Sequence, residues 1–493
     1  MRESGILLPI FSLPGEYGIG SFSKEAYDFV DWLVRCNQKY WQILPLGPTG
    51  FGASPYQSYS TFAGNPFFIS LEELLKEGLI TREELDAQKM PENEEFIDYD
   101  RLEAKRLDIL KKAFERFEPD EDFFRYCDEN KEWLEDYARF RVLKDIYPGK
   151  AWYEWDKEYK FRHKRALAKL DQQYEKQQSY YKFIEYKFMT QWKALKEYAN
   201  EKGVLIIGDI PIYVAMDSAD TWSSPKLFKL DKELKPKFIA GCPPDYFSAD
   251  GQLWGNPVYD WKYHEKTDYE WWIKRLKHCF EIYDVLRLDH FRGFASYYQV
   301  PSSETTAQNG EWIKGPRMDF FNKIKESLGD VSIIAENLGM LTEDVFELLS
   351  ESGYPGMNVL QFAFDGTHDS LYLPHKYCSN SVVYTGTHDN DTLVGWLNKA
   401  GSDEKKFVRD YVGMYNSRDE DLAFGVIRLA MGSVAKLAII PMQDYLELDS
   451  NARINTPSTV GTNWRWRMRP GSTSDYLVGK ISWLTDLFGR NRK

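Results

Sequence analysis

The stretch VLRLDHFRGF, from Val285 to Phe294, decides the fold class. Its leucines are interrupted at alternate positions by Arg287 and Asp289. Because successive side chains of a strand point to opposite faces, the two charged groups share one face and the leucines take the other. A charged pair is costly to bury at the end of a strand unless it has a close partner or a chemical role. The stretch therefore predicts a buried strand that ends at a functional site.

Three other apolar stretches end in the same way. They are GVLIIGDIPIY (203–213), VSIIAENLG (331–339) and SVVYTGTHDND (381–391). Their carboxylates are Asp209, Glu336 and Asp389, the last of which is preceded by His388. In (β/α)8 barrels the active site lies at the carboxyl ends of the strands. We therefore expect an α/β protein, a (β/α)8 TIM barrel with an acidic active site on its C-terminal face.

Composition narrows the classes of partner. Among 493 residues there are 63 Lys and Arg against 76 Asp and Glu, a net charge of −13, so we expect no binding to nucleic acid or to anionic membranes. No run of 18 apolar residues occurs, so no membrane span is expected. The five cysteines are scattered and form no CxxC pair, which is typical of reduced thiols in a cytoplasmic protein.

The spacing of the strands predicts the domain organisation. Residues 1–70 begin the barrel and residues 201–493 complete it, with a loop over the barrel mouth at about 213–260. Residues 71–200 are dense in Lys and Glu and carry apolar side chains at helical spacing. One βα unit averages about 30 residues, so this segment is expected to be a mainly helical insertion between strands 2 and 3.

Two of the carboxylates have the arrangement of a retaining glycosidase. Asp289 and Glu336 end consecutive strands, and neighbouring strands lie about 4.8 Å apart, so we expect the two groups to face each other at roughly 5 Å. At that separation one carboxylate attacks the anomeric carbon and the other protonates the leaving oxygen. Arg287 is expected to keep Asp289 ionised. Asp389, two strands later, suits stabilisation of positive charge at the transition state.

Other interpretations of these carboxylates stay open at the level of residue types. Carboxylates with a histidine also bind Mg²⁺ or Mn²⁺. However, the motifs bring Arg287, Arg292 and many aromatic residues, and they contain no dense D-x-D or H-x-H ligand set. A single Asp at a strand end is more often a cap or an ion pair, but four such acids at one end of a barrel favour chemistry. We therefore expect an enzyme that uses no metal and no organic cofactor.

Six motifs make a resemblance specific. They are SPYQSYSTFAGNP (54–66), GDIPIYVAMDSADTW (208–222), PPDYFSADGQLWGNP (243–257), RLDHFRGF (287–294), AENLG (335–339) and TGTHDNDT (385–392). Together they are similar to the amylomaltase family of 4-α-glucanotransferases (disproportionating enzymes), relatives of the α-amylases. The resemblance runs from residue 5 to the NTPSTVGTNWRWR segment near Arg467, which is nearly the whole chain.

The resemblance implies an enzyme that moves segments of α-1,4-glucans. Its substrates would be maltooligosaccharides or glucans derived from starch or glycogen. The family pattern implies that Asp289 is the nucleophile, Glu336 the acid/base and Asp389 the stabiliser of the transition state. An α-glucan hydrolase of the α-amylase type is the alternative enzyme. A catalytically inactive glucan-binding protein would lack one of the three acids, and all three are present.

The resemblance also implies a set of substrate contacts. It assigns Asp209, Arg287 and His388 to the −1 sugar site, Tyr56 to a stacking platform there, and Gln252 and Trp254 to donor or acceptor subsites. In one place the sequence departs from the family pattern. Ala249 and Asp250 stand where relatives often carry Glu–Thr, so the loop carboxylate that the family pattern assigns to acceptor binding is either displaced by one residue or missing.

Overall fold

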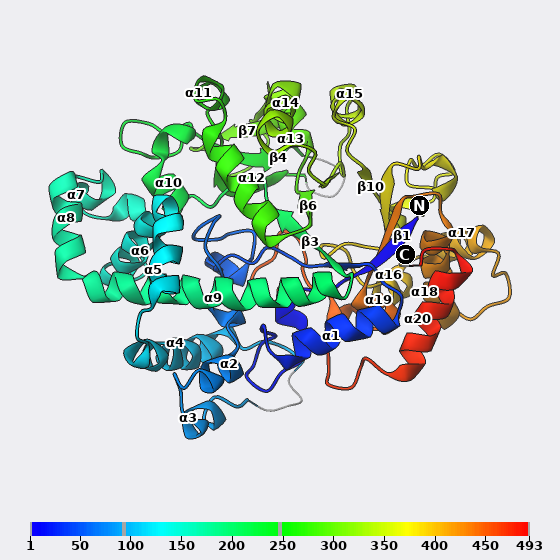
Figure 1. Cartoon of the computed structure of the whole chain (residues 1–493). Coiled ribbons are helices and arrows are strands. Elements are labelled where there is room, and N and C mark those ends of the chain that lie inside the picture. Colours follow the sequence, from blue (N-terminus) through cyan, green and yellow to red (C-terminus); the bar gives the residue numbers. More distant parts are fainter. Residues whose placement is uncertain (1, 91–94, 245–248, 492–493) are drawn as a thin grey trace.

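The computed structural model describes residues 2–90, 95–244 and 249–491, and a closed barrel of parallel strands forms its centre (Figure 1). In sequence order these strands are β1 (Glu3–Leu7), β2 (Tyr40–Gln42), β3 (Leu205–Ile210), β6 (Val285–Leu288), β9 (Ile333–Ala335), β10 (Gly356–Val359), β11 (Ser381–Tyr384) and β12 (Leu437–Pro441). They follow the same order around the barrel, and β12 pairs with β1. The prediction of a (β/α)8 barrel is confirmed.

Helices of the remaining connections surround the strands. They are α1 (Lys24–Arg35), α11 (Trp261–Lys266), α12 (Glu270–Ile282), α13 (Arg292–Ala295), α14 (Arg317–Leu328), α15 (Glu343–Ser352), α16 (Leu393–Lys399), α17 (Ser402–Val412), α18 (Asp419–Gly432), α19 (Met442–Tyr445) and α20 (Asp475–Leu487). Many carry one apolar face, as in α1, where Ala26, Phe29 and Leu33 are buried. This spacing fixes the face that each helix turns toward the barrel.

The barrel interior is filled by side chains, as expected for a packed core rather than a channel. The buried cluster comprises Leu7, Ile207, Ile334, Met357, Val359, Val382, Tyr384, Leu437 and Ile439. Its one hydroxyl has a partner, because Tyr384 donates to Oε1 of Gln42 at 2.9 Å. The interior therefore supports the strand ends above it without leaving that hydroxyl unpaired.

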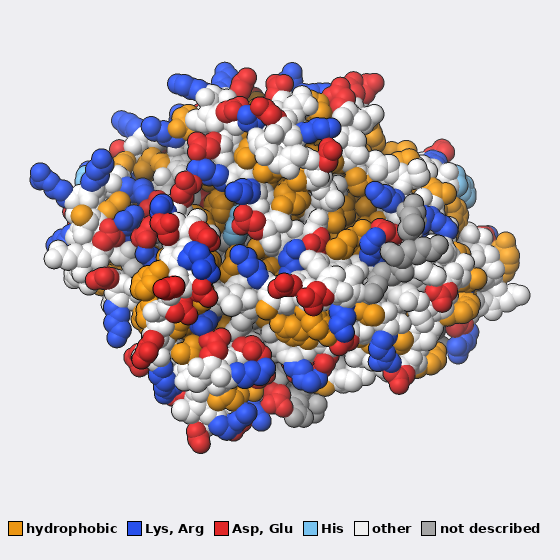
Figure 2. Space-filling model, viewed as in Figure 1, with side chains coloured by type: hydrophobic (Ala, Val, Ile, Leu, Met, Phe, Trp, Pro, Cys, Tyr) orange, Lys and Arg blue, Asp and Glu red, His pale blue; other side chains and the backbone are white. Residues whose placement is uncertain are grey.

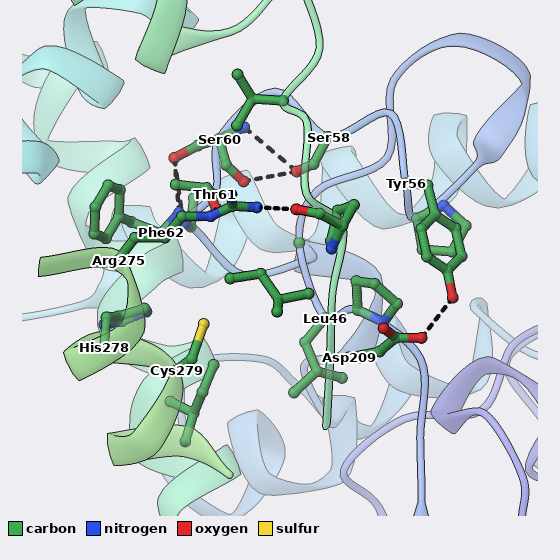
Figure 3. Close-up of a pocket in the computed structure, with 18 of the residues that line it drawn as sticks. Leu46, Tyr56, Ser58, Ser60, Thr61, Phe62, Asp209, Arg275, His278 and Cys279 are labelled. Atoms are coloured by element: carbon green, nitrogen blue, oxygen red, sulfur yellow. Dashed lines mark hydrogen bonds between the residues drawn. The ribbon is translucent and has the colours of Figure 1, made fainter. Parts of the chain in front are cut away.

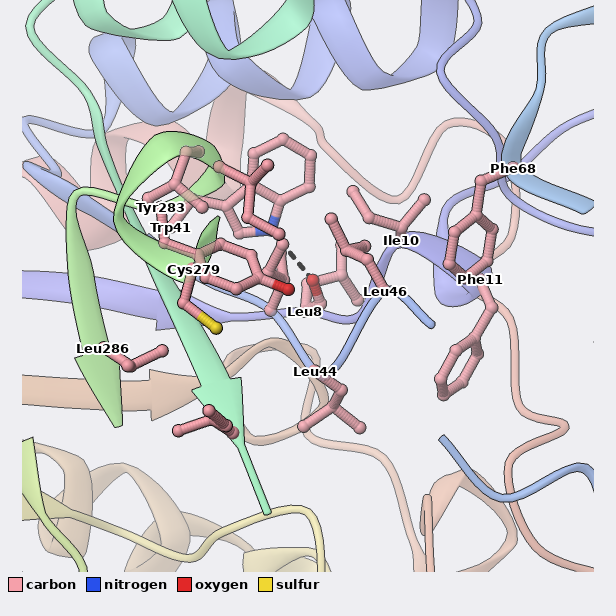
Figure 4. Close-up of a cluster of buried hydrophobic side chains, with 14 of the residues drawn as sticks. Leu8, Ile10, Phe11, Trp41, Leu44, Leu46, Phe68, Cys279, Tyr283 and Leu286 are labelled. Atoms are coloured by element: carbon pink, nitrogen blue, oxygen red, sulfur yellow. Dashed lines mark hydrogen bonds between the residues drawn. The ribbon is translucent and has the colours of Figure 1, made fainter. Parts of the chain in front are cut away.

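A second layer of buried side chains lies between the first barrel strands and the helices outside them (Figure 4). Trp41 of β2 is fully buried there, and its indole N–H donates to the carbonyl of Leu8 at 2.8 Å. Tyr283, just before β6, and Leu286 of β6 belong to the same cluster. Truncating a buried aromatic residue of this kind costs about 3–5 kcal/mol. The cluster thus joins the first strand pair to the strand that carries the predicted nucleophile.

Helices fill the segment between β2 and β3. They are α2 (Leu71–Lys76), α3 (Arg82–Asp86), α4 (Tyr99–Arg116), α5 (Glu121–Glu129), α6 (Lys131–Ile146), α7 (Lys157–Lys160), α8 (Lys164–Gln173) and α9 (Glu175–Glu201). The long helix α9 runs from this insertion back to the barrel and leads into β3 (Figure 1). Phe188, Trp192 and Leu195 of α9 are buried, as the helical spacing predicts. The exact domain boundaries at residues 70 and 200 stay a prediction.

The excursion over residues 213–260, which is predicted to be a loop, contains regular structure. It holds α10 (Ala219–Ser223), β4 (Phe238–Cys242) and β5 (Gln252–Pro257). With β7 (Ser296–Pro301) and β8 (Glu311–Lys314) these strands form an antiparallel sheet in the order β5-β4-β7-β8. The strands are short and rich in Gly and Pro, and β4 pairs with β7 across more than fifty residues of sequence. The local sequence pattern does not predict pairing between strands so far apart in the chain.

Both ends of the described chain meet at β1. The guanidinium of Arg490 donates to the carbonyl of Glu3 at 2.9 Å and to that of Met431 at 2.7 Å. On the face shown in Figure 2, Lys and Arg side chains are interspersed with Asp and Glu. Within the described ranges, no helix combines the length and the hydrophobicity needed to cross a bilayer.

Candidate active site

The strand ends β6 and β9 bring the two central acids together. Leu288 pairs with Ala335, so Asp289 and Glu336 follow directly at the ends of adjacent strands. The backbone N–H of Glu336 donates to the carbonyl of Leu288 at 3.1 Å, which fixes this register. The side chain of Asp289 is 26% exposed, whereas Glu336 is 9% exposed. The structure thus places both predicted acids at one end of the barrel, within reach of solvent.

Arg287 links three of the predicted residues. Its Nη1 contacts both carboxylate oxygens of Asp209, at 2.7 and 2.8 Å, and Oδ1 of Asp289 at 3.0 Å. The hydroxyl of Tyr56 donates to Oδ2 of Asp209 at 2.7 Å. Because the Asp209 side chain is inaccessible to solvent, it serves to orient Arg287 and Tyr56. The guanidinium also occupies the place that a cation bridging the two aspartates would need.

Glu336 is held by two backbone donors. Oε2 accepts from the N–H of His290 at 2.7 Å, and Oε1 accepts from the N–H of Leu338 at 2.8 Å. Burial raises the pKa of Glu336 to about 7, while Arg287 and these two N–H groups oppose the rise. A carboxyl group that titrates near neutrality is suited to general acid/base catalysis.

Asp289 differs from Glu336 in having a cation in direct contact. Burial raises the pKa of Asp289 above its ordinary value, Arg287 opposes this, and the carboxylates of Asp209 and Glu336 add to it. Arg287 contacts Asp289, but burial outweighs its effect on the pKa of Asp289, so the expectation that Arg287 keeps Asp289 ionised stays a prediction. A direct ion pair stabilises an anion more than neutral N–H donors do. When the two acids share one proton, we therefore assign it to Glu336 and the negative charge to Asp289.

Asp389 stands on the segment between β11 and α16, opposite the pair. Its Oδ1 accepts from the side-chain amide of Asn455 at 2.6 Å, and its backbone carbonyl accepts from Arg453 at 2.5 Å. The Asp389 side chain is still 45% exposed. Sequence reasoning missed Asn455 and Arg453, because they lie more than sixty residues away and no local pattern connects them to Asp389.

Tyr56 belongs to an aromatic wall beside the acids. Its ring stacks on His388, with centroids 5.1 Å apart and planes at 17°, and it lies 5.7 Å from Trp464. Burial lowers the pKa of His388, so its imidazole is neutral at pH 7. One face of Tyr56 is therefore already covered. The predicted stacking on a sugar has to use the opposite face, and Trp464 joins the wall without having been predicted.

Trp254 and Gln252 lie on β5, and the Trp254 ring reaches His290, the residue after Asp289. The indole N–H of Trp254 donates to Oε1 of Gln252 at 3.1 Å. Its ring meets that of His290 edge-to-face at 4.8 Å and lies 6.2 Å from Tyr213. Trp254 therefore has more ring neighbours than its Gly- and Pro-rich surroundings predict. His290, next to Asp289, contacts Trp254 with its ring and Glu336 with its backbone, a role that sequence reasoning missed.

The departure from the family pattern lies at the far end of this sheet. The carboxylate of Asp250 accepts from the side-chain amide of Gln308 at 3.0 Å, and its backbone carbonyl accepts from the N–H of Ala307 at 2.8 Å. Ala249 beside it is exposed. Residues 245–248 of the same motif lie outside the described ranges. The Asp250 carboxylate thus braces the connection between β7 and β8.

A small cavity lies behind Tyr56 and Asp209 (Figure 3). It has a volume of about 50 Å³, enough for a few water molecules and too small for a sugar. Arg275 of α12 lines it and donates to Oγ1 of Thr61 at 2.6 Å. The three acids do not line this cavity, so it is part of the support of the Tyr56 loop and not the reaction site. In the described part of the chain, no three His, Cys, Asp or Glu side chains are grouped as metal ligands.

Comparison with known proteins agrees with this geometry. A 4-alpha-glucanotransferase of Clostridium butyricum is 48% identical over 485 residues, which cover 98% of this chain and 99% of that protein. The 4-alpha-glucanotransferase of Thermus thermophilus is 43% identical over 484 residues, 96% of each chain. The solved amylomaltase from Streptococcus agalactiae in complex with acarbose is 42% identical, with a TM-score of 0.96 and full coverage of both chains.

The family assignment follows from a match over most of the sequence. A family model described as 4-alpha-glucanotransferase matches residues 8–473. The matched range contains the barrel strands from β2 to β12 and every acid described above, and it begins directly after β1. This chain therefore belongs to the 4-α-glucanotransferase (amylomaltase) family.

Proposed function

We propose that this chain transfers segments of α-1,4-glucans to the 4-hydroxyl of glucose or of another glucan, with retention of configuration and a covalent intermediate on Asp289. One observation supports this most strongly. The two acids at paired strand ends differ in their partners, since Asp289 contacts the guanidinium of Arg287 at 3.0 Å and Glu336 is held by two backbone N–H groups. The acarbose complex of the Streptococcus agalactiae relative supports an oligosaccharide site in this fold.

In the first step the glycosidic bond is broken. Protonated Glu336 gives its proton to the glycosidic oxygen while Asp289 attacks the anomeric carbon, so one C–O bond breaks and another forms. Positive charge builds up on the sugar ring between these events. Asp389, whose side chain is 45% exposed and whose Oδ2 lies 3.4 Å from Nε2 of His388, stabilises that charge. Tyr56, Asp209 and Arg287, which are joined by hydrogen bonds, support the same sugar site.

In the second step an acceptor hydroxyl displaces Asp289 from the anomeric carbon. Ionised Glu336 takes a proton from an acceptor hydroxyl, whose oxygen attacks the anomeric carbon and releases Asp289. Two inversions give net retention. A sugar hydroxyl gives transfer and water gives hydrolysis, so the activity depends on which of the two reaches the intermediate first.

Incubation with maltotriose alone tests this proposal. Separation of the products by size is expected to show glucose together with a ladder of longer oligomers, while the total number of reducing ends stays constant. Reducing ends that rise in step with maltotriose consumption would support the hydrolase alternative. Unchanged maltotriose would contradict both enzyme interpretations.

We also propose that the protein acts in the cytoplasm without metal or organic cofactor. The five cysteines carry free thiols, and Cys36 and Cys279 are buried, which is typical of proteins from reducing compartments. In the two-step mechanism each proton is moved by Glu336 and the charge is stabilised by Asp389. No step of that mechanism calls for a Lewis acid.

A further inference from the structure

The segment that carries Asp389 is held at both of its ends. It runs from Thr385, directly after β11, to Leu393 at the start of α16, and it includes His388 and Asp389. In a barrel, β11 has β10 on one side and β12 on the other. After each of these two neighbouring strands, the chain supplies one residue that contacts both ends of the segment.

Asp444 supplies the contact from the β12 side. It lies on α19, immediately after β12, and is 1% exposed. Its Oδ2 accepts from the hydroxyl of Thr385 at 2.6 Å, and its Oδ1 accepts from the backbone N–H of Leu393 at 2.8 Å. Burial raises the pKa of Asp444 to about 7. A single desolvated carboxyl group thus joins the first and the last residue of the segment.

Gln361 supplies the contact from the β10 side. Its backbone N–H donates to the carbonyl of Thr385 at 3.3 Å, and its side-chain amide donates to the carbonyl of Asp391 at 2.7 Å. The approach is close, because a Cβ at Gly386 would lie 2.7 Å from Nε2 of Gln361. The segment is therefore held between two flanking residues that do not belong to it.

Two further contacts stiffen the segment, one within it and one to Ser450 outside it. The side-chain oxygen of Asn390 accepts from both the N–H and the hydroxyl of Thr387 at 2.9 Å. Oδ2 of Asp391 accepts from Ser450 at 2.8 Å. With its ends and its turn fixed, the segment leaves Asp389 little freedom to move. Its place is then set by how firmly the two ends are held.

We propose that Asp444 is a positioning residue for the transfer reaction, acting through Thr385 and Leu393 to place Asp389 and His388 at the reacting sugar. This inference rests on the proposed role of Asp389. A carboxylate stabilises a developing charge only from a defined position, and a displacement of about 1 Å can cost about a hundredfold in rate. Asp444 contacts no reacting group itself, so its loss changes the reaction through the geometry of the segment.

Two substitutions at this position separate geometry from charge. Asp444→Ala removes both bonds, and we expect kcat for maltotriose transfer to fall by about tenfold or more, with KM within about threefold. Asp444→Asn keeps both bonds, because the amide oxygen accepts from Leu393 and the hydroxyl of Thr385 turns to accept from the NH₂ group. Its kcat is expected to stay within about threefold of wild type.

Gln38→Ala serves as the matched control. Gln38 is fully buried and makes two bonds, to the carbonyl of Cys36 at 2.9 Å and to the hydroxyl of Thr485 at 2.8 Å, at the opposite end of the barrel. It should lower the melting temperature and leave kcat per folded molecule unchanged. If Asp444→Ala yields no folded protein, Thr385→Val replaces it, since this change keeps the volume and removes one of the two bonds.

Asp389→Asn is measured beside these variants so that two failures can be told apart. If Asp389→Asn keeps wild-type activity, the proposed role of Asp389 is wrong. If Asp389→Asn is inactive and Asp444→Ala has wild-type kcat per folded molecule, the positioning role alone is overturned. An Asp444→Asn enzyme as slow as Asp444→Ala would also overturn it, because geometry would then not be what Asp444 supplies.

Discussion

At the scale of single residues, the site is a matter of charge balance. Four carboxyl groups surround one guanidinium: Asp209 and Asp289 contact Arg287, whereas Glu336 and Asp389 rely on N–H donors. One cation cannot offset four buried or half-buried negative charges. Glu336 makes no ion pair with Arg287, and burial raises its pKa to about 7, so we expect Glu336 to carry the proton that the first step needs.

Asp289→Asn is expected to abolish transfer and hydrolysis together, by more than about a thousandfold, because an amide cannot form the glycosyl ester. Product formation from maltotriose measures both reactions. Mass spectrometry excludes deamidation back to aspartate, and the melting temperature shows whether the fold is retained. Transfer within about tenfold of wild type would mean that Asp289 is not the nucleophile.

Glu336→Gln is expected to fail only with donors whose leaving group needs a proton. An α-glucosyl fluoride leaves unaided, so formation of the intermediate should recover with it, while release to an acceptor stays slow. In wild type, kcat/KM for maltotriose should fall as the pH rises through about 7, since the acid form of Glu336 is then lost. With the fluoride donor, kcat/KM should not show this fall with rising pH. Equal losses on both donors would give Glu336 a purely structural role.

At the scale of elements, the sequence predicts the strands and helices that local patterns of residues define. The four strand ends that carry acids follow from alternation and from the carboxylates that close them. The sheet β5-β4-β7-β8 and the contacts of Asn455 with Asp389 do not follow, because both join segments far apart in sequence. Family resemblance selects Trp254 as a functional residue, whereas only the structure shows that it sits on β5 against His290.

Trp254→Ala tests this edge of the sheet. If its ring binds the acceptor sugar, truncation removes a stacking contribution of roughly 1 kcal/mol, which slows capture by sugar and leaves the access of water unchanged. The ratio of transfer to hydrolysis should fall, with the melting temperature nearly unchanged. If the Trp254 ring instead only holds Tyr213 and His290 in place, we expect Trp254→Ala to lower the melting temperature and to reduce both reactions in proportion. Glucose release, oligomer formation and thermal melting on this one variant decide between the two.

At the scale of the whole molecule, the barrel is closed by residues from its two ends. β1 pairs with β12, and the C-terminal tail crosses over this seam. Arg490 is fully buried there and donates to three carbonyls: Met431, Glu3 and Ser433. The seam lies away from the acids, which stand at the carboxyl ends of the strands, so stability and catalysis can be separated experimentally.

Arg490→Ala is expected to destabilise the protein without altering the reaction. The carbonyls of Met431, Glu3 and Ser433 each lose a donor, and Ser433 keeps its bond from Arg2. A buried polar group that loses its partner costs about 1–3 kcal/mol, so the melting temperature should drop by several degrees. Arg125→Ala is the control, because that arginine is 64% exposed and pairs with a nearby surface carboxylate, Asp122; such pairs contribute about 0–1 kcal/mol. The kcat of folded Arg490→Ala should equal that of wild type below its melting temperature. If Arg490→Ala has the same melting temperature as Arg125→Ala, the tail does not hold the barrel closed. A lower kcat of fully folded Arg490→Ala would show that the seam is coupled to the acids across the barrel.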